Sequence, residues 1–331
     1  MKRIYIMIIC LAAVLNAAGQ NFYVMEYNVE NLFDCRHDSL KNDYEYLPRG
    51  LRAWNYRRYR TKLDRIAKVI ASAIPGGGLP DIVGLCEVEN QRCMRDLTRY
   101  SALREAGYRY IITDSPDLRG IDVALLYQRG SFKPLQSEAI RIAPLEGHRP
   151  TRDILHVAGQ IITGDTLDIF LCHMPSRSGG KVLSEPYRLH TARTLRHKTD
   201  SITIARQRPE IIIIGDFNDY PRDKALKKEL RAHRPTDKIS EGELYNLMDR
   251  RGEWTYSHKG HKGVLDHAIV NGILLRRNNP TRAVEAKSIR LEWLIEEDAV
   301  YGGDKPHRTY SGMRYNDGWS DHLPILIKFE Y

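Results

Sequence analysis

The sequence predicts an α/β fold in which two packed β-sheets are flanked by helices, and three observations support this class. Short apolar runs recur along the 331 residues of the chain. Several runs are apolar without alternation, which is typical of strands that are covered on both faces. Helical patterns fall between these runs, so helices are expected on the outer faces of the sheets. A single doubly wound sheet would have the same three features and remains an alternative at this point.

The expected strands are short apolar runs, many of them rich in the β-branched residues that favour extended chain. They cover residues 22–28, 81–87, 122–128, 154–162, 167–173, 211–216, 264–270 and 323–330. No repeat, low-complexity tract or linker rich in glycine, serine and proline divides the chain. We therefore expect one domain over residues 21–331.

Three segments between the strands have patterns typical of helices. Residues 56–74 place apolar side chains at helical spacing and are followed by a proline and three glycines. Residues 184–207 are long and basic, with Ser184 and Pro186 in positions typical of a helix N-terminus. Residues 291–303 have helical spacing and end at two glycines, so a third helix is expected there.

The first 20 residues are typical of a secretory signal peptide. Lys2 and Arg3 precede an apolar run over residues 4–15, and small residues follow in residues 16–20. The run is too short to span a bilayer comfortably, although an anchor helix or a buried strand is an alternative. We expect cleavage near Gln20 and export to the periplasm or the cell exterior, without a stable membrane span.

The chain is basic, with 51 lysines and arginines against 42 acidic residues and a formal net charge of +9. Cleavage of the signal peptide removes Lys2 and Arg3 and no acid, which lowers the net charge by two to +7. A basic surplus suits polyanionic partners such as nucleic acid or anionic lipid headgroups.

Four cysteines follow the expected signal peptide, and their spacing does not match a zinc site. Cys86 and Cys172 lie in apolar runs, so they are expected in the core. An oxidising compartment permits disulfides. The pairing of these two cysteines with Cys35 and Cys93 is left open by the sequence.

Polar clusters stand where the apolar runs stop, so their side chains are expected to project from rigid elements into one cleft. Carboxylate and amide oxygens are the ligands that hard divalent cations such as Mg²⁺ prefer. Histidines beside carboxylates suit proton transfer. The clusters contain Asn28 with Glu30, Glu87 with Glu89, His173 with Ser176 and Arg177, Asp216 with Asn218 and Asp219, Asp266 with His267, and Asp321 with His322.

Each cluster alone also has a structural interpretation. The motif "GDFND", residues 215–219, is typical of a turn in which aspartate and asparagine bond to their own backbone. Glu30 and Glu89 could cap helices, and a single histidine at a strand end is more often structural than catalytic. Six clusters that each follow an apolar run favour a shared catalytic cleft over six unrelated turns.

In this order the clusters resemble the motifs of the endonuclease/exonuclease/phosphatase superfamily, in its deoxyribonuclease I-like, secreted bacterial form. The matching patterns are N-x-E, E, H-x-x-S-R, G-D-x-N-D, L-D-H and S-D-H-x-P, spread over residues 24–324. "GDFND" and the terminal "SDHLP" are the most specific, and "YNVEN" is weaker. The superfamily includes pancreatic deoxyribonuclease, abasic-site nucleases, bacterial sphingomyelinases and inositol polyphosphate phosphatases. The resemblance implies a four-layered α/β/β/α sandwich of two mixed sheets flanked by helices.

The resemblance also implies a role for each matching residue. Glu87 corresponds to the principal Mg²⁺ ligand, Glu30 lies near the metal, and Asp321 is a second carboxylate on the metal side. Asn28 corresponds to a residue that contacts phosphate. Mg²⁺ is the expected cofactor, with Mn²⁺ or Ca²⁺ as alternatives.

The remaining matches are the implied catalytic residues. His173 corresponds to a residue that binds or protonates a phosphate oxygen. Asp216 and Asn218 correspond to the pair that orients the attacking water and the scissile phosphate. Asp266 holds the terminal histidine, His322, and the general base is either Asp216 or His322.

Two basic loops are candidate substrate contacts. Arg177, in the loop of residues 174–181, could bind a phosphate that flanks the cleavage site, although a solvated flexible loop is an equal alternative. In residues 254–263, Trp254 or Tyr256 could stack on nucleic-acid bases, but packing within a hairpin is favoured.

These observations predict an exported, metal-dependent phosphodiesterase, and an endonuclease that acts on nucleic acid is the preferred form. The alternative is a phosphatase or phospholipase C-like hydrolase that acts on phosphoinositide, sphingomyelin or sugar phosphates. The tryptophan-cysteine-aspartate-arginine signature of inositol phosphatases is replaced around Asp266 by "GVLDHAIV". A catalytically silent binding module is less favoured, because every metal and histidine position is filled. A monomer is expected.

Overall fold

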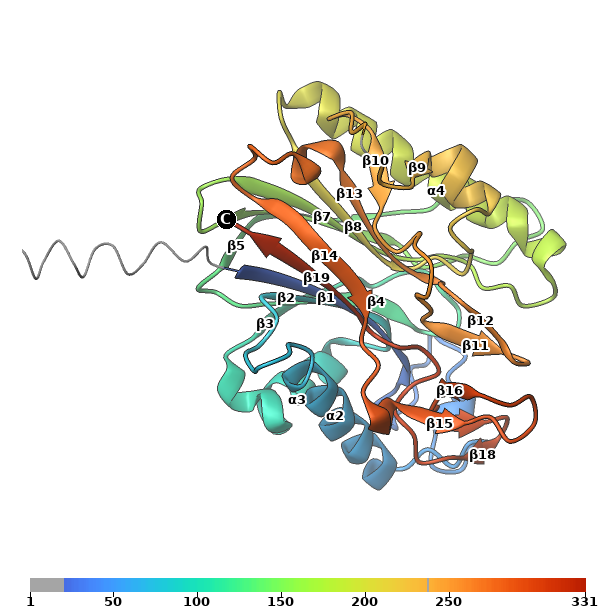
Figure 1. The fold of residues 1–331 in the computed structure, drawn as a ribbon. Helices are drawn as coiled ribbons and strands as arrows, with labels where there is room; N and C mark the ends of the chain where they lie inside the picture. Colours follow the sequence, from blue (N-terminus) through green and yellow to red (C-terminus); the bar gives the residue numbers. More distant parts are fainter. Residues whose placement is uncertain (1–20, 237) are drawn as a thin grey trace, which may run out of the picture.

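Two β-sheets form the inner layers of a four-layered sandwich (Figure 1). The computed structural model describes residues 21–236 and 238–331, so the expected signal peptide lies outside the described residues. One sheet has the strand order β14-β19-β1-β2-β4-β3, and the other has the order β5-β6-β7-β8-β13-β10-β9. Both sheets combine parallel and antiparallel pairs.

The elements have the following bounds. The six-stranded sheet contains β1 (Asn21–Leu32), β2 (Ile82–Val88), β3 (Arg109–Ile112), β4 (Asp122–Tyr127), β14 (Arg282–Ser288) and β19 (Ile325–Glu330). The seven-stranded sheet contains β5 (Phe132–Ile140), β6 (Ile154–Ile161), β7 (Thr166–His173), β8 (Glu210–Asp216), β9 (Ala232–His233), β10 (Leu244–Asn246) and β13 (Asp266–Asn271). Hairpins pair β11 (Tyr256–His258) with β12 (His261–Gly263), β15 (Ile295–Glu297) with β16 (Asp304–Pro306), and β17 (Tyr310–Ser311) with β18 (Arg314–Tyr315). The helices are α2 (Tyr56–Ala71), α3 (Gln91–Tyr100) and α4 (Lys181–Ala205), with short 3₁₀ or π segments at η1 (Tyr44–Tyr46), η2 (Ala102–Ala106), η3 (Ala225–Leu230), η4 (Gly272–Leu275) and η5 (Glu292–Leu294).

The four isoleucines of β8 show why the apolar runs do not alternate. Ile212 and Ile214 pack into the core between the two sheets, whereas Ile211 and Ile213 pack into the core that α4 covers. The other sheet is covered by α2 and α3 through a third cluster of buried apolar residues. Each sheet therefore has one face on its partner sheet and one on helices, which confirms the predicted sandwich and excludes the single doubly wound sheet.

The two sheets come very close at Gly84 of β2. A Cβ atom at this position would lie 2.8 Å from methyl groups of both Leu171 and Ile214 on the facing sheet. Glycine thus fits here because of the close approach of the opposite layer.

All eight predicted strands are present, and the predicted helices at residues 56–74 and 184–207 correspond to α2 and α4. The predicted start of α4 was wrong, because the helix begins at Lys181 after Gly180. Ser184 and Pro186 lie inside the helix, where the Ser184 hydroxyl donates a hydrogen bond to the Gly180 carbonyl over 2.8 Å.

The helix expected over residues 291–303 was also wrong. The segment contains only the short turn η5 and then forms the first strand and the connection of the β15–β16 hairpin. Gly302 and Gly303 both have positive φ and shape this connection, where the Gly302 amide donates to the carbonyl of Asp298. The two glycines therefore form a hairpin turn and do not end a helix.

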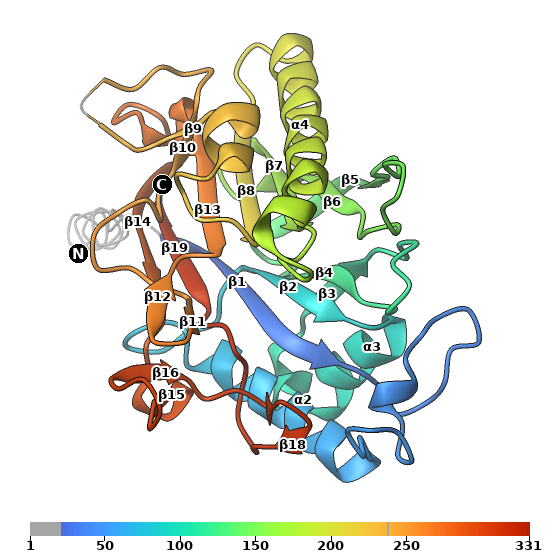
Figure 2. The ribbon, with the colours of Figure 1, turned by 90° about the vertical axis from the view of Figure 1, so that its right-hand side faces the viewer.

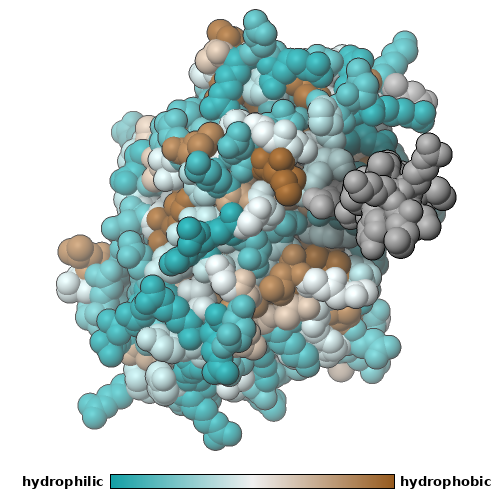
Figure 3. Space-filling model, turned by 90° about the vertical axis from the view of Figure 1, so that its left-hand side faces the viewer, coloured by the Kyte–Doolittle hydropathy of each residue, from teal (hydrophilic) through white to brown (hydrophobic). Residues whose placement is uncertain are grey.

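The cysteines and the surface bear on the expectations from the sequence. Cys86 and Cys172 are buried as predicted, and the four cysteines within the described residues are free thiols. No helix in the described part of the chain is long and apolar enough to cross a membrane. On the face shown in Figure 3, hydrophobic residues form small separate groups among polar ones.

Glu210, at the start of β8, predicts a pH dependence of stability. Burial raises its pKa from 4.5 to about 7, although Asn279 donates a hydrogen bond to its Oε1 over 2.6 Å. The folded protein therefore holds this proton to higher pH than the unfolded chain, so stability falls as pH rises from about 4.5 to about 7. We expect Glu210→Gln to remove up to about 3 kcal/mol of this decrease. Urea unfolding of both proteins at several pH values measures it, and parallel pH profiles would contradict the prediction.

Candidate active site

The carboxyl ends of the parallel strand pairs β1–β2 and β7–β8 meet at one edge of the sandwich, which faces the viewer in Figure 2. In the strand register, His173 lies opposite Asp216 of the neighbouring strand. Asp216 in turn lies opposite Asp266 of the antiparallel strand β13. Three adjacent strands thus bring three of the predicted residues side by side.

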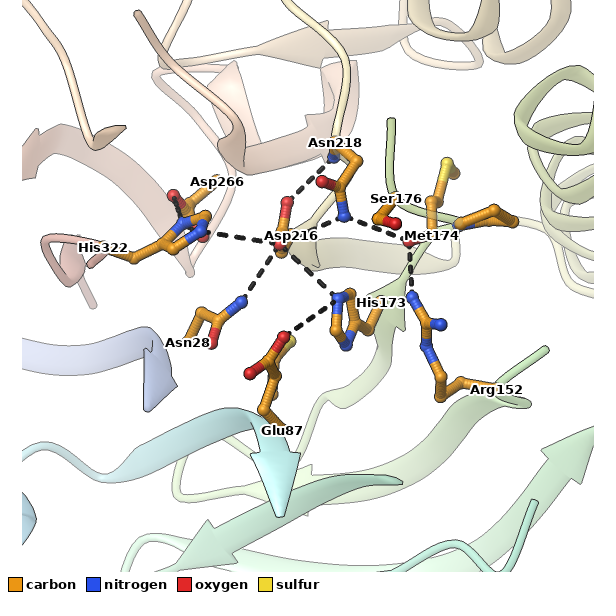
Figure 4. Close-up of polar contacts among 12 residues, drawn as sticks. Asn28, Glu87, Arg152, His173, Met174, Ser176, Asp216, Asn218, Asp266 and His322 are labelled. Atoms are coloured by element: carbon orange, nitrogen blue, oxygen red, sulfur yellow. Dashed lines mark hydrogen bonds and ion pairs between the residues drawn. The ribbon is translucent and has the colours of Figure 1, made fainter. Parts of the chain in front are cut away.

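Asp216 is the centre of the site and is 1% exposed. Its Oδ2 accepts hydrogen bonds from the side-chain amides of Asn28 (3.0 Å) and Asn218 (3.2 Å), and its Oδ1 accepts one from the Asn218 backbone (2.8 Å). Oδ2 also lies 3.6 Å from Nε2 of His173 and 3.9 Å from Nε2 of His322 (Figure 4). Asn28 belongs to the other sheet, so this carboxylate joins the two inner layers at the site.

His322 is held in one orientation by Asp266. Its Nδ1 lies 2.8 Å and 3.0 Å from the two oxygens of Asp266, which is fully buried. Ser320 fixes the backbone of His322, because its hydroxyl accepts a hydrogen bond from the His322 amide and donates one to the Asn28 carbonyl. The Asp266 contact makes Nδ1 the protonated nitrogen and turns Nε2 toward Asp216.

The site shifts its titrating groups in opposite directions. Burial raises the pKa of Asp216 to about 7, against the opposing effect of His322. Burial alone would lower the pKa of His322, but the carboxylates of Asp266 and Asp216 outweigh it and raise that pKa well above its ordinary value. Burial, followed by Arg152 and Arg119, lowers the pKa of His173 well below its usual range. His173 is therefore neutral near pH 7, whereas His322 is cationic.

Glu87 has the features of a metal ligand. Its Oε2 accepts a hydrogen bond from the Asn31 amide over 2.9 Å, which fixes the carboxylate. Its Oε1 lies 3.8 Å from His173 Nε2 and 3.7 Å from Arg119 Nη2, distances too long for hydrogen bonds. One anionic oxygen thus remains available at the edge of the site, and it suits a hard divalent cation.

The other two predicted metal-side carboxylates lie around an arginine that the sequence did not indicate. Arg308 donates to Asp321 Oδ2 over 2.9 Å, and its Nε lies 3.8 Å from Glu30 Oε1. Both oxygens of Glu30 also accept backbone amides, from Thr309 (2.6 Å) and Tyr310 (3.2 Å). Burial and then Asp321 raise the pKa of Glu30 to about 7. In this structure Glu30 anchors the C-terminal loop. Both of its oxygens are hydrogen-bonded, so it lacks the free oxygen that the predicted place near the metal would use.

Asp216, Asp266 and His322 form a second group with metal-ligand chemistry. They offer ligand atoms that lie within 4.8 Å of one another. However, the Nδ1 of His322 is already hydrogen-bonded to Asp266. This bond favours proton transfer over metal coordination at the group, so Glu87 is the better starting point for a cation site.

Left-handed backbone is concentrated at the site. Glu30, Asn31, Glu87 and Asn218 all have φ between 51° and 68°, a region that costs a non-glycine residue energy. The four residues hold or contact the groups described above. The strain accordingly falls on residues that form or support the site.

Gly215, directly before Asp216, predicts a large loss of stability on substitution. Its φ is +140°, and a Cβ there would lie 1.9 Å from the carbonyl oxygen of Cys172 on the adjacent strand. We expect Gly215→Ala to destabilise the fold by at least about 3 kcal/mol, measured by urea unfolding. Gly130→Ala is the control, since a Cβ there meets nothing within 4 Å. A Gly215→Ala protein as stable as this control would contradict the prediction.

The predicted phosphate contact by Arg177 is not supported by its position. Its guanidinium donates to the Asn218 carbonyl over 2.7 Å and to the carboxylates of Asp219 (3.1 Å) and Asp223 (2.5 Å). These bonds hold the turn after β8, so the arginine is committed within the protein. The alternative of a solvated loop agrees with the exposure of Ser176 and residues 178–181, although Arg177 and Lys181 tie the loop to Asp223.

The loop of residues 254–263 packs as a hairpin, which was the favoured interpretation. Trp254 is 7% exposed, and Lys262 lies over its ring. Tyr256 instead faces the site, with its ring 4.9 Å from that of His322 between centroids. Tyr256 thus limits the space around the imidazole.

Several residues of the site could not be found from motifs. Arg119, Arg152 and Arg308 come from loops and have no distinctive spacing. Glu26 lies in the middle of the first apolar run, and its pKa is raised well above the usual range by burial and by Asp266 and Asp216. Its one signal was a charged residue within the apolar run "FYVMEYN".

A buried carboxylate with amide donors and two nearby imidazoles, next to an open carboxylate, suits the chemistry of phosphoryl transfer. The model of the endonuclease/exonuclease/phosphatase family matches residues 23–331. The chain therefore belongs to this family, whose members are phosphoric ester hydrolases that depend on divalent metal ions. None of the curated proteins is similar enough in sequence to be a recognisable relative.

Solved structures of low sequence identity share the fold. A mannosyl-6-phosphatase of Bacteroides thetaiotaomicron has a TM-score of 0.59 and 16% identity, covering 94% of this chain and 100% of its own. A humanised TDP2 of D. rerio has a TM-score of 0.57 and 17% identity, with 94% and 99% covered. The catalytic domain of human nocturnin with bound sulfate has a TM-score of 0.57 and 17% identity, with 93% and 94% covered.

Proposed function

We propose that this protein is an exported phosphodiesterase that hydrolyses nucleic acid with the help of Mg²⁺. The observation that carries the proposal is the convergence of Asn28, Asn218, His173 and His322 on the buried carboxylate of Asp216. Glu87 lies beside this group with one carboxylate oxygen available, and Asp321 lies on the same edge. The residues present therefore fit a divalent cation of the kind on which the family depends.

Each residue has a defined task in this proposal. Asn28 and the neutral His173 donate hydrogen bonds to non-bridging phosphate oxygens, where negative charge develops. Asn218 positions the Asp216 carboxylate through its side chain and its backbone amide. Asp216 accepts a hydrogen bond from the attacking water and aligns it with the phosphorus. A divalent cation held by Glu87 with Asp321 supplies polarisation of the phosphoryl group.

The proton balance rests on Asp216 and His322. The proton of the attacking water passes to Asp216, whose pKa of about 7 makes it a competent base near neutral pH. The cationic His322, fixed by Asp266, stabilises the charge that develops on the phosphoryl oxygens. We therefore propose Asp216, and not His322, as the general base.

Nucleic acid is the preferred substrate for two reasons. The net charge of +7 after cleavage of the proposed signal peptide and the arginines around the cleft, Arg119, Arg152 and Arg308, attract a polyanion. A structurally similar TDP2 of D. rerio has been solved with a single-stranded DNA product. Binding of an extended phosphate chain is also consistent with the open edge on which the site lies.

A small phosphate ester is the second candidate substrate, and a cavity beside the site favours it. The cavity has a volume of about 730 Å³, which is the size of a pocket for a small ligand. The similar mannosyl-6-phosphatase and nocturnin structures belong to the same fold.

A substrate panel tests the proposal. Purified protein is incubated with plasmid DNA, RNA, phosphoinositide, sphingomyelin and sugar phosphates, each with Mg²⁺, Mn²⁺ or Ca²⁺ and with EDTA. Metal-dependent nicking of DNA or cleavage of RNA, lost with EDTA and in Asp216→Ala, supports the nuclease. Release of phosphate or phosphocholine alone supports the second candidate, and metal binding without turnover would indicate a silent binding module.

Export is tested separately. The proposed signal peptide covers residues 1–20, and residues 21–331 are proposed to form the mature domain. N-terminal sequencing of the protein recovered from its native host should find the first residue near Gln20. An intact N-terminus in the cytoplasmic fraction would contradict export.

A further inference from the structure

The cavity of about 730 Å³ lies beside the candidate active site, and two of its lining residues contact groups of the site. Arg152, in its lining, donates to the Met174 carbonyl over 2.6 Å, and Asn218 of the site donates to the same oxygen over 3.1 Å (Figure 4). Arg119, also in the lining, lies 3.7 Å from Glu87. A molecule bound at Asp216 could therefore extend directly into this space.

The cavity is positively charged. Three arginines, Arg119, Arg149 and Arg152, line it. Asp117 is the sole acidic side chain among the described residues of the lining, and Arg152 lies 3.2 Å from it. Arg149 is exposed and has no ion pair with any residue that the structure describes. This arginine is free to bind an anion.

Buried polar groups in the cavity wall lack partners. Thr151, Arg152 and Tyr187 are 3%, 6% and 4% exposed. Within residues 21–236 and 238–331, the Thr151 hydroxyl and the Arg152 Nε–H form no hydrogen bond, and the Tyr187 hydroxyl, whose partner is the Thr151 backbone, donates its own proton to no acceptor. Buried donors are almost always satisfied in folded proteins, so three such groups around one cavity indicate a polar ligand that accepts hydrogen bonds.

The N-terminus of α4 adds to the same field. The 25-residue helix begins beside the cavity, where Gly179, Leu183 and Ser184 belong to the lining. Its N-cap is Gly180, which provides no side-chain cap for the first amides. The partial positive charge of this helix end, added to the arginines, favours a phosphate over a neutral group.

We infer that the cavity binds a second phosphate of the substrate while the scissile phosphate lies at Asp216. The inference rests on the proposed phosphoesterase function and narrows its substrate class to compounds with two neighbouring phosphates. Such a phosphate can come from the adjacent nucleotide of a nucleic acid or from a small bisphosphate. A lone phosphate ester would leave the cavity without its anionic ligand.

Paired substrates test the inference. The nucleic-acid arm compares TpT, which has one phosphate, with pTpT and TpTp, which have two; the small-molecule arm compares fructose monophosphate with fructose bisphosphate. In Arg149→Ala and Tyr187→Phe, KM for the two-phosphate substrate should rise by about tenfold in at least one arm. KM for the one-phosphate substrate should stay within about twofold, since the lost interaction involves only the second phosphate. The arm that responds identifies the source of the phosphate.

Arg129→Ala is the matched control, because Arg129 is an exposed arginine that lies in the turn after β4 and outside the cavity lining. Tyr187→Phe keeps the shape of the wall, and unfolding midpoints of all variants verify the fold. Equal changes for both substrate classes in both arms, or no change, would overturn the inference while leaving the proposed function intact. If the wild type hydrolyses no phosphate ester, the proposed function fails. Binding of fructose bisphosphate and of pTpT to the cavity is then measured by calorimetry. The inference is overturned if neither compound binds, or if the wild type and Arg149→Ala bind them equally well.

Discussion

Replacing Asp216 by asparagine is expected to lower kcat by about 10³-fold or more while the fold stays intact. Asparagine preserves the size of the side chain but removes the anionic oxygen that accepts the Asn28 and Asn218 amides and aligns the attacking water. His322→Ala should have a comparable effect, because it removes the cation that Asp266 orients. Steady-state hydrolysis of the best substrate of the panel measures both.

The control for Asp216 lies on the same strand. Glu210 at the other end of β8 is also a buried carboxyl group whose pKa is raised to about 7 by burial, yet it is remote from the cleft. Glu210→Gln should leave kcat within about twofold of the wild type. For His322→Ala, added imidazole should restore part of the activity, which separates loss of the cation from damage to the fold. Wild-type kcat in a folded Asp216→Asn protein would reject the assignment.

Replacing Glu87 by glutamine is expected to raise the Mg²⁺ concentration for half-maximal activity by at least about tenfold. The substitution removes the charge of the available Oε1 but keeps an oxygen that can accept the Asn31 amide, so the local backbone should hold. Calorimetric titration with Mn²⁺ gives a second readout that does not depend on turnover.

Glu89→Gln is the matched control for Glu87. Glu89 lies two residues further along the chain and accepts the Asp34 amide over 2.7 Å. It is not among the predicted metal residues, so its loss should leave the metal response unchanged. Identical metal titrations for Glu87→Gln and the wild type would exclude Glu87 as a ligand.

The sequence predicted the fold well because the strands are covered on both faces. Runs such as residues 211–216 have no polar interruption until they reach the site, so both their extent and their end are visible. The β15–β16 hairpin was missed because Leu291, Leu294 and Ile295 have helical spacing for a different reason: Leu294 packs in the core, Leu291 packs against it, and Ile295 begins a short strand. Periodicity over so few residues does not distinguish the two structures.

The candidate site was predictable where polar residues follow strands directly. His173, Asp216 and Asp266 are set side by side by register alone, which a pattern of strand ends already suggests. Arginines that reach the site from loops leave no such pattern. The contacts of Arg177 could not be foreseen for the same reason, since its partner Asp223 lies 46 positions away in sequence and nothing local reveals the pair.

The left-handed backbone at Glu30, Asn31, Glu87 and Asn218 has a consequence for attempts to make this protein more robust. Glycine at any of these positions would relieve a conformation that costs on the order of 1–3 kcal/mol, so thermal screening would select it. Glycine at Asn31 keeps the backbone amide that donates to Glu87. Glycine at any of the other three positions removes a side chain that forms or supports the cleft. Selection for thermal stability alone would therefore favour variants that are more stable but have lost side chains of the cleft. A selection for stability in this protein should also measure activity from the first round.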